Sequence, residues 1–332
     1  MSRRFVSQLA HQEAVDQIFL ASEKQLRPNR NGNLYLQVEL SDRTGSIGAR
    51  MWNASEADYR CFENGDYVRV EGSTQLFQGT IQMIATKIGK ASSDQVCADD
   101  FCILDSRQVD QLTVRLSTHL RKVTDPQLRS LAECFLMDEE FMGKFSRAPA
   151  GVKNHHAYTG GLLEHVVSLM DLVQRIAGLY QGLNTDLLLM GAFLHDMGKI
   201  DELIYERDFA YSYEGQLIGH VVMAVGMLDA KVRQAEELAG EPISPETILR
   251  LKHMIVSHHG QYEFGSPKLP MTLEAVALHL LDNLDAKLHS FTQLMRDDPN
   301  VESPWTNFHQ SLGRKLFKGE AECRGQNGTA SA

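Results

Sequence analysis

The sequence contains no run of about 18 apolar residues, the length that a membrane-spanning helix needs. Its first residues include two arginines but no apolar core long enough for a secretory signal, so we expect a cytoplasmic protein. The five cysteines are odd in number and form no CxxC pair, which predicts reduced thiols without a joint role. With 332 residues, 43% hydrophobic and 23% charged, the chain has the composition of a globular protein and the length for two domains.

The chain also lacks an excess of positive charge, and its net charge of −10 argues against a general nucleic-acid coat protein. The charge is uneven, however. Residues 1–90 contain 11 basic and 10 acidic residues, whereas the other 242 contain 22 and 33. The N-terminal part is therefore the less repulsive surface for a polyanion, and bound cations could offset part of the acidic remainder.

The N-terminal part alternates between apolar and polar residues with the period of two that is typical of strands. After a short helix at 11–20, we expect strands at 34–40, 46–52, 67–77 and 77–85. Short strands with glycine-rich corners predict a small closed barrel of about five strands. The pattern Tyr-Leu-x-Val-x-Leu-Ser-Asp-Arg-Thr-Gly-x-Ile, followed by Asp-Tyr-Val-x-Val-x-Gly, resembles the OB-fold.

OB-folds of this kind bind single-stranded nucleic acid through exposed aromatic side chains and basic residues. The candidate contacts are Tyr35, Trp52, Phe77, Arg50 and Arg69. The alternative is that these aromatic residues fill the barrel core, since every small barrel needs large side chains inside.

Residues 91–105 are small and acidic, as is typical of a linker, and most of the remaining chain is expected to be helical. The expected helices are 109–123, 125–145, 161–179, 185–197, 214–238, 244–258 and 272–295. Order is expected to decline from residue 299. A group of aromatic and basic residues is interpreted as part of a solvated C-terminal helix, with contact to RNA as the alternative. The group is Trp305, Arg314, Lys315 and Lys318.

Nine of the 13 histidines lie between residues 155 and 279, and several apolar helices carry a histidine or an aspartate near one end. The most regular of these positions are His165, His195, Asp196, His220, His258, His259 and Asp282. An ionised aspartate inside an apolar helix is expensive unless it is paired or bound to a metal. Because imidazole and carboxylate together favour Mn, Fe, Ni or Zn, the set predicts transition-metal ions.

The centre of this set is residues 191–199, where His195 and Asp196 end an apolar run and Lys199 follows on the same helix face. A carboxylate has two oxygens, so Asp196 is placed to bridge two ions. Two bridged ions would activate a water and stabilise the leaving oxygen of a phosphoester. Lys199 could neutralise a non-bridging phosphate oxygen.

The ordered set resembles the HD-domain metal phosphohydrolase superfamily, and its combination with an N-terminal OB-fold is similar to the YhaM family of 3'-5' exoribonucleases. The matching motifs are residues 154–156, 160–165, 193–200, 215–220, 257–260 and 281–287. The resemblance covers residues 30–295, and no ligand position is missing from it.

The resemblance implies a ligand set for two divalent transition metals, most often Mn²⁺, with Fe, Co or Ni as alternatives. The first metal would be held by His165, His195, Asp196 and Asp282, and the second by Asp196, His220 and His258. Asp196, Lys199 and His259 would be the catalytic residues, with His259 behind the ligands or against the phosphate. His156, and less so His155, would face the substrate. Asp285 would orient a ligand or pair with a lysine, whereas His253 and His279 are interpreted as ordinary core or surface histidines.

We therefore expect a multidomain protein with an all-β OB-fold barrel followed by an all-α HD-domain helical bundle. The expected domains are the barrel at 1–95, a linker with leading helices at 96–150, the HD domain at 151–312 and a partly disordered tail at 313–332. The favoured function is a metal-dependent 3'-5' exonuclease that hydrolyses single-stranded RNA, with single-stranded DNA as a second substrate, to 5'-mononucleotides. Two alternatives stay open: a phosphohydrolase of free or cyclic nucleotides with a regulatory barrel, and a strand-binding protein with a scaffold HD domain. Homo-oligomerisation is also left open.

Overall fold

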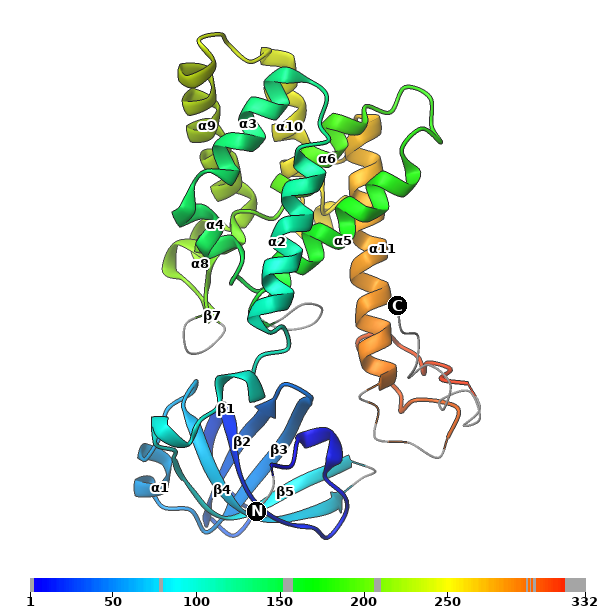
Figure 1. The fold of residues 1–332 in the computed structure, drawn as a ribbon. Coiled ribbons are helices and arrows are strands. Elements are labelled where there is room, and N and C mark those ends of the chain that lie inside the picture. Colours follow the sequence, from blue (N-terminus) through cyan, green and yellow to red (C-terminus); the bar gives the residue numbers. More distant parts are fainter. Residues whose placement is uncertain are drawn as a thin grey trace. The chain divides into compact units, whose positions relative to one another are not determined.

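The computed structural model describes residues 3–77, 80–151, 158–205, 210–296, 298, 300 and 303–319. The chain divides into two compact units, the first made of residues 1–103 with 291–332 and the second of residues 104–290 (Figure 1). None of the described helices is both long and apolar enough to cross a membrane.

The first unit contains a closed barrel with the strand order β1-β2-β3-β5-β4. Its strands are β1 (Ala14–Pro28), β2 (Leu34–Asp42), β3 (Gly45–Trp52), β4 (Tyr67–Phe77) and β5 (Thr80–Lys90). All neighbours are antiparallel except β3 and β5, which pair in parallel. Short helices lie around it: η1 (Val6–Gln8), α1 (Glu56–Arg60), η2 (Ser93–Gln95) and η3 (Ala98–Asp100). The inward side chains of all five strands form one apolar core.

The helix expected at 11–20 is wrong, because residues 14–20 form the first half of β1. The run Ile-Phe-Leu-Ala at 18–21 is continuous and apolar, and periodicity alone does not separate such a run from a buried helix. Strand pairing decides the outcome: Phe19 pairs with Val68 of β4, and Ala21 pairs with Leu40 of β2.

The second unit is a bundle of helices (Figure 1). Its helices are α2 (Ser106–Leu120), α3 (Pro126–Leu136), α4 (Glu139–Phe145), α5 (Gly161–Ile176), α6 (Thr185–Leu194), α7 (Lys199–Glu202), α8 (Tyr213–Ile218), α9 (His220–Ala239), α10 (Pro245–Ser257) and the larger part of α11 (Leu273–Arg296). The short η4 (Tyr262–Phe264) and the strand pair β6 (Leu203–Ile204) and β7 (Ala210–Tyr211) complete it.

Helix α6 is the centre of this bundle. Every residue from Leu187 to Leu194 is buried, as expected for a helix that is apolar on all sides. It packs against α5 and α10, which carry other residues of the predicted metal site.

Two expected helices are interrupted in the structure. The one at 125–145 is divided into α3 and α4, because the Asp138 carboxylate accepts from the Phe141 amide and caps a new helix. The one at 214–238 is divided by Gly219, whose φ of 79° ends α8 and lets α9 begin at His220.

The C-terminal residues differ from the expected helix. Residues 303–319 form a hairpin with bridges between Trp305 and Phe317 and between His309 and Arg314. The local sequence pattern does not predict this hairpin, because its two bridges join residues that are separated along the chain.

Candidate metal centre

Helix α6 positions the central pair. His195 is the C-cap of α6, Asp196 follows in the turn after it, and Lys199 is the first residue of α7. The side chains of His195 and Asp196 are 0% and 5% exposed, so both lie inside the bundle. The apolar run before them thus places an imidazole and a carboxylate where water is excluded.

The two oxygens of the Asp196 carboxylate face different groups of residues. Its Oδ1 lies 3.4 Å from His220 Nε2 and 3.5 Å from His258 Nε2. Its Oδ2 lies 3.4 Å from His195 Nε2 and 2.6 Å from Lys199 Nζ. Asp196 therefore stands between two clusters of candidate ligands, as a bridging carboxylate would.

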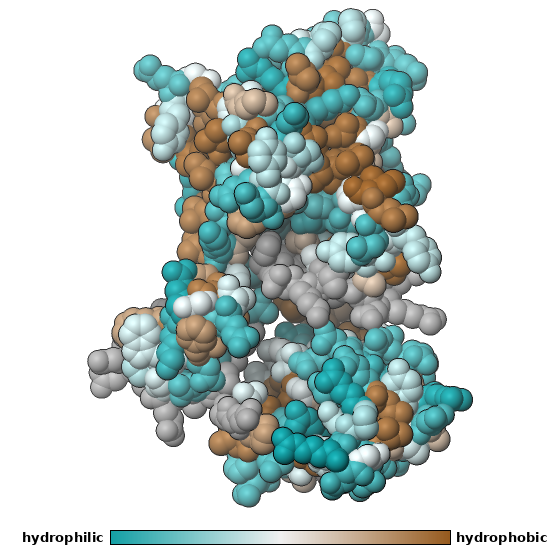
Figure 2. Space-filling model, turned by 180° about the vertical axis from the view of Figure 1, so that it is seen from behind, coloured by the Kyte–Doolittle hydropathy of each residue, from teal (hydrophilic) through white to brown (hydrophobic). Residues whose placement is uncertain are grey.

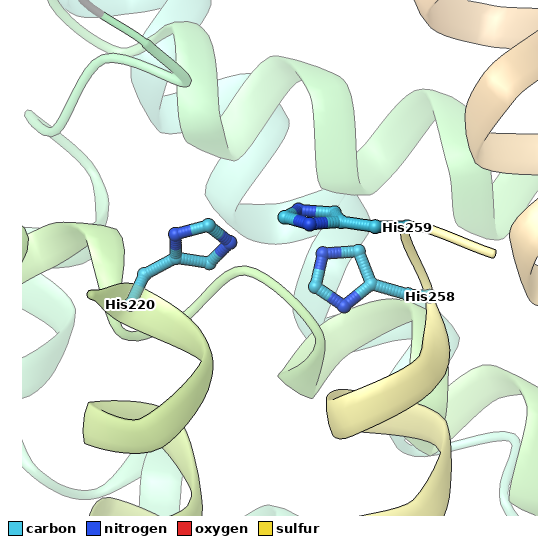
Figure 3. A group of neighbouring side chains, drawn as sticks. All are labelled: His220, His258 and His259. Carbon is cyan, nitrogen blue, oxygen red and sulfur yellow. The ribbon is translucent and has the colours of Figure 1, made fainter. Parts of the chain in front are cut away.

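The two clusters draw on five segments of the bundle. The first is His165 from α5, His195 and Asp282 from α11, and the second is His220, His258 and His259. Within each cluster the candidate ligand atoms lie within 4.8 Å of one another. Figure 3 shows His220 at the start of α9 facing His258 and His259 at the end of α10. The structure thus brings together every predicted metal ligand and adds His259 to the second cluster.

Each of four histidines is held through its Nδ1 atom, which leaves Nε2 for the centre. His165 Nδ1 lies 2.9 Å from Asp285, and His220 Nδ1 lies 3.0 Å from Glu202. The other two bind main-chain carbonyl oxygens: His195 Nδ1 lies 2.9 Å from that of Ala192, and His258 Nδ1 lies 2.7 Å from that of Ile255. Such contacts orient metal-binding histidines and fix their tautomer.

Buried polar atoms at the centre test whether the residues fit a cation. His195 Nε2, His220 Nε2, His258 Nε2 and Asp196 Oδ1 are buried and make no hydrogen bond to any described residue. Their separations of 3.4–3.5 Å from Asp196 are close contacts that are too long for good hydrogen bonds. Several unsatisfied buried atoms that converge on one place are costly, and divalent cations would satisfy them. The donor set fits transition metals.

The protonation states of the second cluster suit metal binding. Burial lowers the pKa of His258, and burial with the neighbouring His258 and His220 lowers the pKa of His259 to about 3. Both imidazoles are therefore neutral at pH 7, which is the state that binds a metal.

The first cluster and the lysine carry charge. Burial opposes ionisation of Asp196, but Lys199 and His195 hold the pKa of that carboxyl well below its usual range. The same ion pair raises the pKa of Lys199 despite its burial. Burial lowers the pKa of His165, but hydrogen bonds to Asp282 and Asp285 outweigh it and raise that pKa to about 10. A metal at His165 would therefore replace a proton.

Glycine permits the close approach of the segment that carries Lys199. A Cβ atom on Gly198 would lie 2.1 Å from the carbonyl oxygen of His220. The backbone at the start of α7 thus touches the residue that begins α9. Only a residue without a side chain allows this contact, which explains the glycine before Lys199.

Sequence reasoning missed Glu202, which is one of the residues that orient the site. Its Oε1 accepts from the backbone amide of His220 at 2.9 Å as well as facing the ring. Asp285 was expected either to orient a ligand or to pair with a lysine, and its contact with His165 matches the first. His279 was interpreted as a core or surface histidine, and its Nδ1 lies 2.8 Å from the carbonyl oxygen of His258. A carboxylate three residues after a Gly-Lys pair was the only signal for Glu202.

Four of the five residues predicted to contact single-stranded nucleic acid lie together on the barrel. Tyr35 of β2 pairs across the strands with Trp52 of β3, and their rings are 5.2 Å apart. The Arg50 guanidinium lies 5.7 Å from the Phe77 ring centroid. Trp52 and Phe77 are each 46% exposed, so neither fills the core. Strands 2 and 3 form the face on which OB-folds bind oligonucleotides.

Arg69 lies elsewhere, on β4 beside β1. Its guanidinium forms two hydrogen bonds of 2.7 Å to the Asp16 carboxylate, so its charge is already paired. The predicted substrate-side residues His155 and His156 lie outside the described residues.

Comparisons with known proteins agree with both parts of this arrangement. A family model described as "HD domain" matches residues 162–287, and one described as "OB-fold nucleic acid binding domain" matches residues 21–91. The 3'-5' exoribonuclease YhaM of Bacillus velezensis is 36% identical over 277 residues, which cover 83% of this chain and 86% of that protein. That of Bacillus subtilis is 35% identical over 278 residues, again 83% of this chain and 86% of that protein. The chain belongs to the YhaM family of 3'-5' exoribonucleases.

YhaM relatives extend over both described units, because a third, from a Geobacillus species, is 36% identical over 78% of this chain and 78% of its own length. The expected family and the expected order, a barrel followed by a helical HD domain, are therefore confirmed. Among solved structures, the second OB-fold domain of replication protein A from Methanococcus maripaludis covers 26% of this chain at 22% identity, with a TM-score of 0.22. That likeness is too low to support an inference.

Proposed function

We propose that this protein is a metal-dependent 3'-5' exoribonuclease that hydrolyses single-stranded RNA, and also single-stranded DNA, to 5'-mononucleotides. The observation that carries the proposal is the Asp196 carboxylate, whose two oxygens face two separate clusters of ligands. The direction of digestion and the preference for RNA come from the names of its YhaM relatives.

We assign two metal ions to the site. His165, His195, Asp196 and Asp282 would hold the first, and Asp196, His220, His258 and His259 the second. The imidazole-rich set favours a transition metal, and we propose Mn²⁺, with Fe, Co and Ni as the other candidates. When bound, such a pair of ions supplies an activated water and stabilises the leaving oxygen.

The remaining chemistry falls to the chain's own residues. Lys199 donates to Asp196 at 2.6 Å and holds that carboxylate ionised between the clusters. Its ammonium group is largely buried beside this carboxylate, which supports a role in neutralising a phosphate oxygen. Glu202 and Asp285 fix the rings of His220 and His165, so the ligands need little reorganisation.

The barrel would hold the strand. Tyr35, Trp52 and Phe77 offer aromatic surface for stacking, and Arg50 adds a positive charge among them. Such contacts tolerate any base, as an exonuclease without sequence preference requires. We place the activity in the cytoplasm, in keeping with the free thiols of the described cysteines Cys61, Cys97, Cys102 and Cys134.

We also propose that the protein forms homo-oligomers through α11. Its exposed face carries Leu273, Val276, Leu280, Leu284 and Leu288. This spacing of three and four residues is that of a helix seam, so two such stripes can cover each other. Figure 2 shows apolar residues gathered on the surface of this helical unit. Light scattering of the wild type and of Leu280→Glu tests the assignment, since the charge should lower the measured mass.

A labelled strand tests the proposed activity. Single-stranded RNA with a 5' label is incubated with Mn²⁺-loaded protein, with and without chelator, and the products are separated by length. A ladder that shortens only with metal supports the proposal, and a 3'-terminal phosphorothioate block should delay it. An untouched strand, with hydrolysis of a free or cyclic nucleotide, would instead assign the site to a nucleotide phosphohydrolase.

A further inference from the structure

The C-terminal hairpin, defined here as residues 298, 300 and 303–319, is the part of the chain to which the proposed function gives no role. Its backbone is well defined by hydrogen bonds. The Thr306 amide donates to the Leu316 carbonyl at 2.8 Å, and the His309 amide donates to the Arg314 carbonyl at 3.1 Å. The hairpin is thus a built element and not an irregular tail.

The interior of the hairpin is polar. Lys318 Nζ donates to the Asp298 carboxylate at 2.7 Å, and these side chains are 2% and 1% exposed. The backbone amides of Asn300 and Asn307 donate to the same carboxylate at 3.1 and 2.9 Å. A buried ion pair adds little net stability, because the desolvation of both charges offsets their attraction. The Lys318–Asp298 ion pair instead fixes the positions of the hairpin segments around it.

The aromatic residues of the hairpin lie outside. Trp305, Phe308 and Phe317 are 47%, 57% and 55% exposed. The rings of Trp305 and Phe317 lie next to each other, with centroids 4.9 Å apart. A small element would normally bury such rings as its core, so their exposure indicates that the aromatic surface binds something.

The charge of the hairpin indicates what it binds. Residues 303–319 contain three basic residues and no aspartate or glutamate, although the whole chain has a net charge of −10. Lys318 is neutralised by Asp298, which leaves Arg314 and Lys315 as exposed positive charges. Flat aromatic rings beside exposed basic side chains are the features by which proteins bind single strands without reading their sequence.

We propose that the C-terminal hairpin is a second binding surface for single-stranded nucleic acid, separate from the barrel. Bases stack on Trp305 and Phe317, and phosphates contact Arg314 and Lys315. This inference rests on the proposed function, since the ligand is the strand that the helical unit would degrade. The surface adds affinity only for strands long enough to reach it as well as the barrel.

Intrinsic fluorescence reports on the proposed contact directly, because the chain has only two tryptophans. In Trp52→Phe, Trp305 is the sole tryptophan, and excitation at wavelengths that tyrosine does not absorb makes it the sole emitter. A single-stranded phosphorothioate oligonucleotide is titrated into this metal-loaded variant, and binding is followed in parallel by the anisotropy of a label on the strand. We expect the Trp305 emission to be quenched along the same curve. Unchanged emission while the strand saturates the protein would overturn the proposal.

Variants in the otherwise wild-type chain measure the contribution. One OB-fold covers roughly 4–16 nucleotides. For strands longer than this, Trp305→Ala should weaken binding by about 5- to 100-fold. Binding of shorter strands should be unaffected. Trp305→Phe should restore most of the affinity. Arg314→Gln and Lys315→Gln should each lower the slope of log affinity against log salt by about 0.7. Leu249→Ala, at an exposed apolar residue of α10, is the control and should change nothing.

Two results separate this proposal from the proposed function. If wild-type protein degrades RNA but Trp305→Ala binds and degrades long strands as well as wild type, the hairpin proposal is wrong and the exonuclease stands. If no metal yields degradation yet Trp305 is quenched, the strand-binding surface stands without the exonuclease. If Trp305→Ala instead changes the mass measured by light scattering, the surface contacts a second copy and the proposal is overturned.

Discussion

The metal centre and the strand-binding face of the barrel hold their functional side chains in opposite ways. At the centre, His195 and Asp196 are buried. Four ligand histidines direct Nε2 to the centre, and a hydrogen-bond partner fixes the Nδ1 atom of each. On the barrel, Trp52 and Phe77 are half exposed; Trp52 lies beside the Tyr35 ring, and Phe77 lies beside the Arg50 guanidinium. Hydrolysis requires atoms that are placed before the substrate arrives, whereas a strand that must slide requires surfaces that do not grip any one base.

The largest effect should come from the residue between the two clusters. Asp196→Asn keeps the size of the side chain but removes its charge and one acceptor oxygen. We expect turnover of labelled RNA to fall by more than about 1,000-fold, while binding of the strand survives. Asp229→Asn, at a surface carboxylate that pairs with Lys252, is the control. Full activity in Asp196→Asn would refute the assignment of the bridge.

Gly198→Ala should come next, through packing. The new Cβ would lie 2.1 Å from the His220 carbonyl oxygen, so α7 and α9 would have to separate. We expect a loss of about 1–3 kcal/mol in the free energy of unfolding, together with weaker metal binding. Gly226→Ala on α9, where a Cβ meets nothing within 4 Å, should be neutral or stabilising. Denaturant titrations that rank the two variants equally would contradict this reading of the contact.

Glu202→Ala tests whether the centre depends on residues behind the ligands. Without that carboxylate, neither the ring nor the backbone amide of His220 is held. We expect metal affinity, measured by competition with a chelator, to fall by about 10- to 100-fold, with the fold intact by circular dichroism. Asp229→Ala removes a carboxylate from the same helix that His220 begins and should leave metal affinity unchanged.

A feature of the fold or of the metal site was predictable where residues close together in the sequence determine it. The ligand residues are recognisable because His195, His220 and His258 stand at the ends of helices, whereas His165 and Asp282 interrupt apolar helical runs. The alternation in β2 and β3 likewise predicts that Tyr35 and Trp52 lie on strands. The partners that orient the ligands were harder, since Glu202 meets His220 only after the chain folds back through β6, β7 and α8. The prediction of a helix at the start of β1 was wrong for a related reason. Pairing with β2 and β4, and not the local sequence pattern, makes this segment a strand.

The barrel should give smaller and graded effects. Trp52→Ala and Tyr35→Ala should each raise the KM for a long strand with little change in kcat, because stacking on one base contributes about 1–3 kcal/mol. Arg69→Ala should matter less, since its guanidinium is already paired with Asp16 in the free protein. An Arg69 variant that weakens binding more than Trp52→Ala would move the strand path to β1 and β4.

The smallest effect concerns pH, at the buried pair of the C-terminal hairpin. Burial raises the pKa of Asp298, but Lys318 and the amides of Asn307 and Asn300 outweigh it, so the pKa lies below the ordinary 3.8. A depressed carboxyl pKa contributes stability that is present above 3.8 and is lost as the pH falls through the lowered value. Trp305 emission in Trp52→Phe should therefore stay constant from neutral pH down to about 4 and change only below it. A change that begins near pH 6 would mean that a histidine, and not this carboxylate, holds the hairpin together.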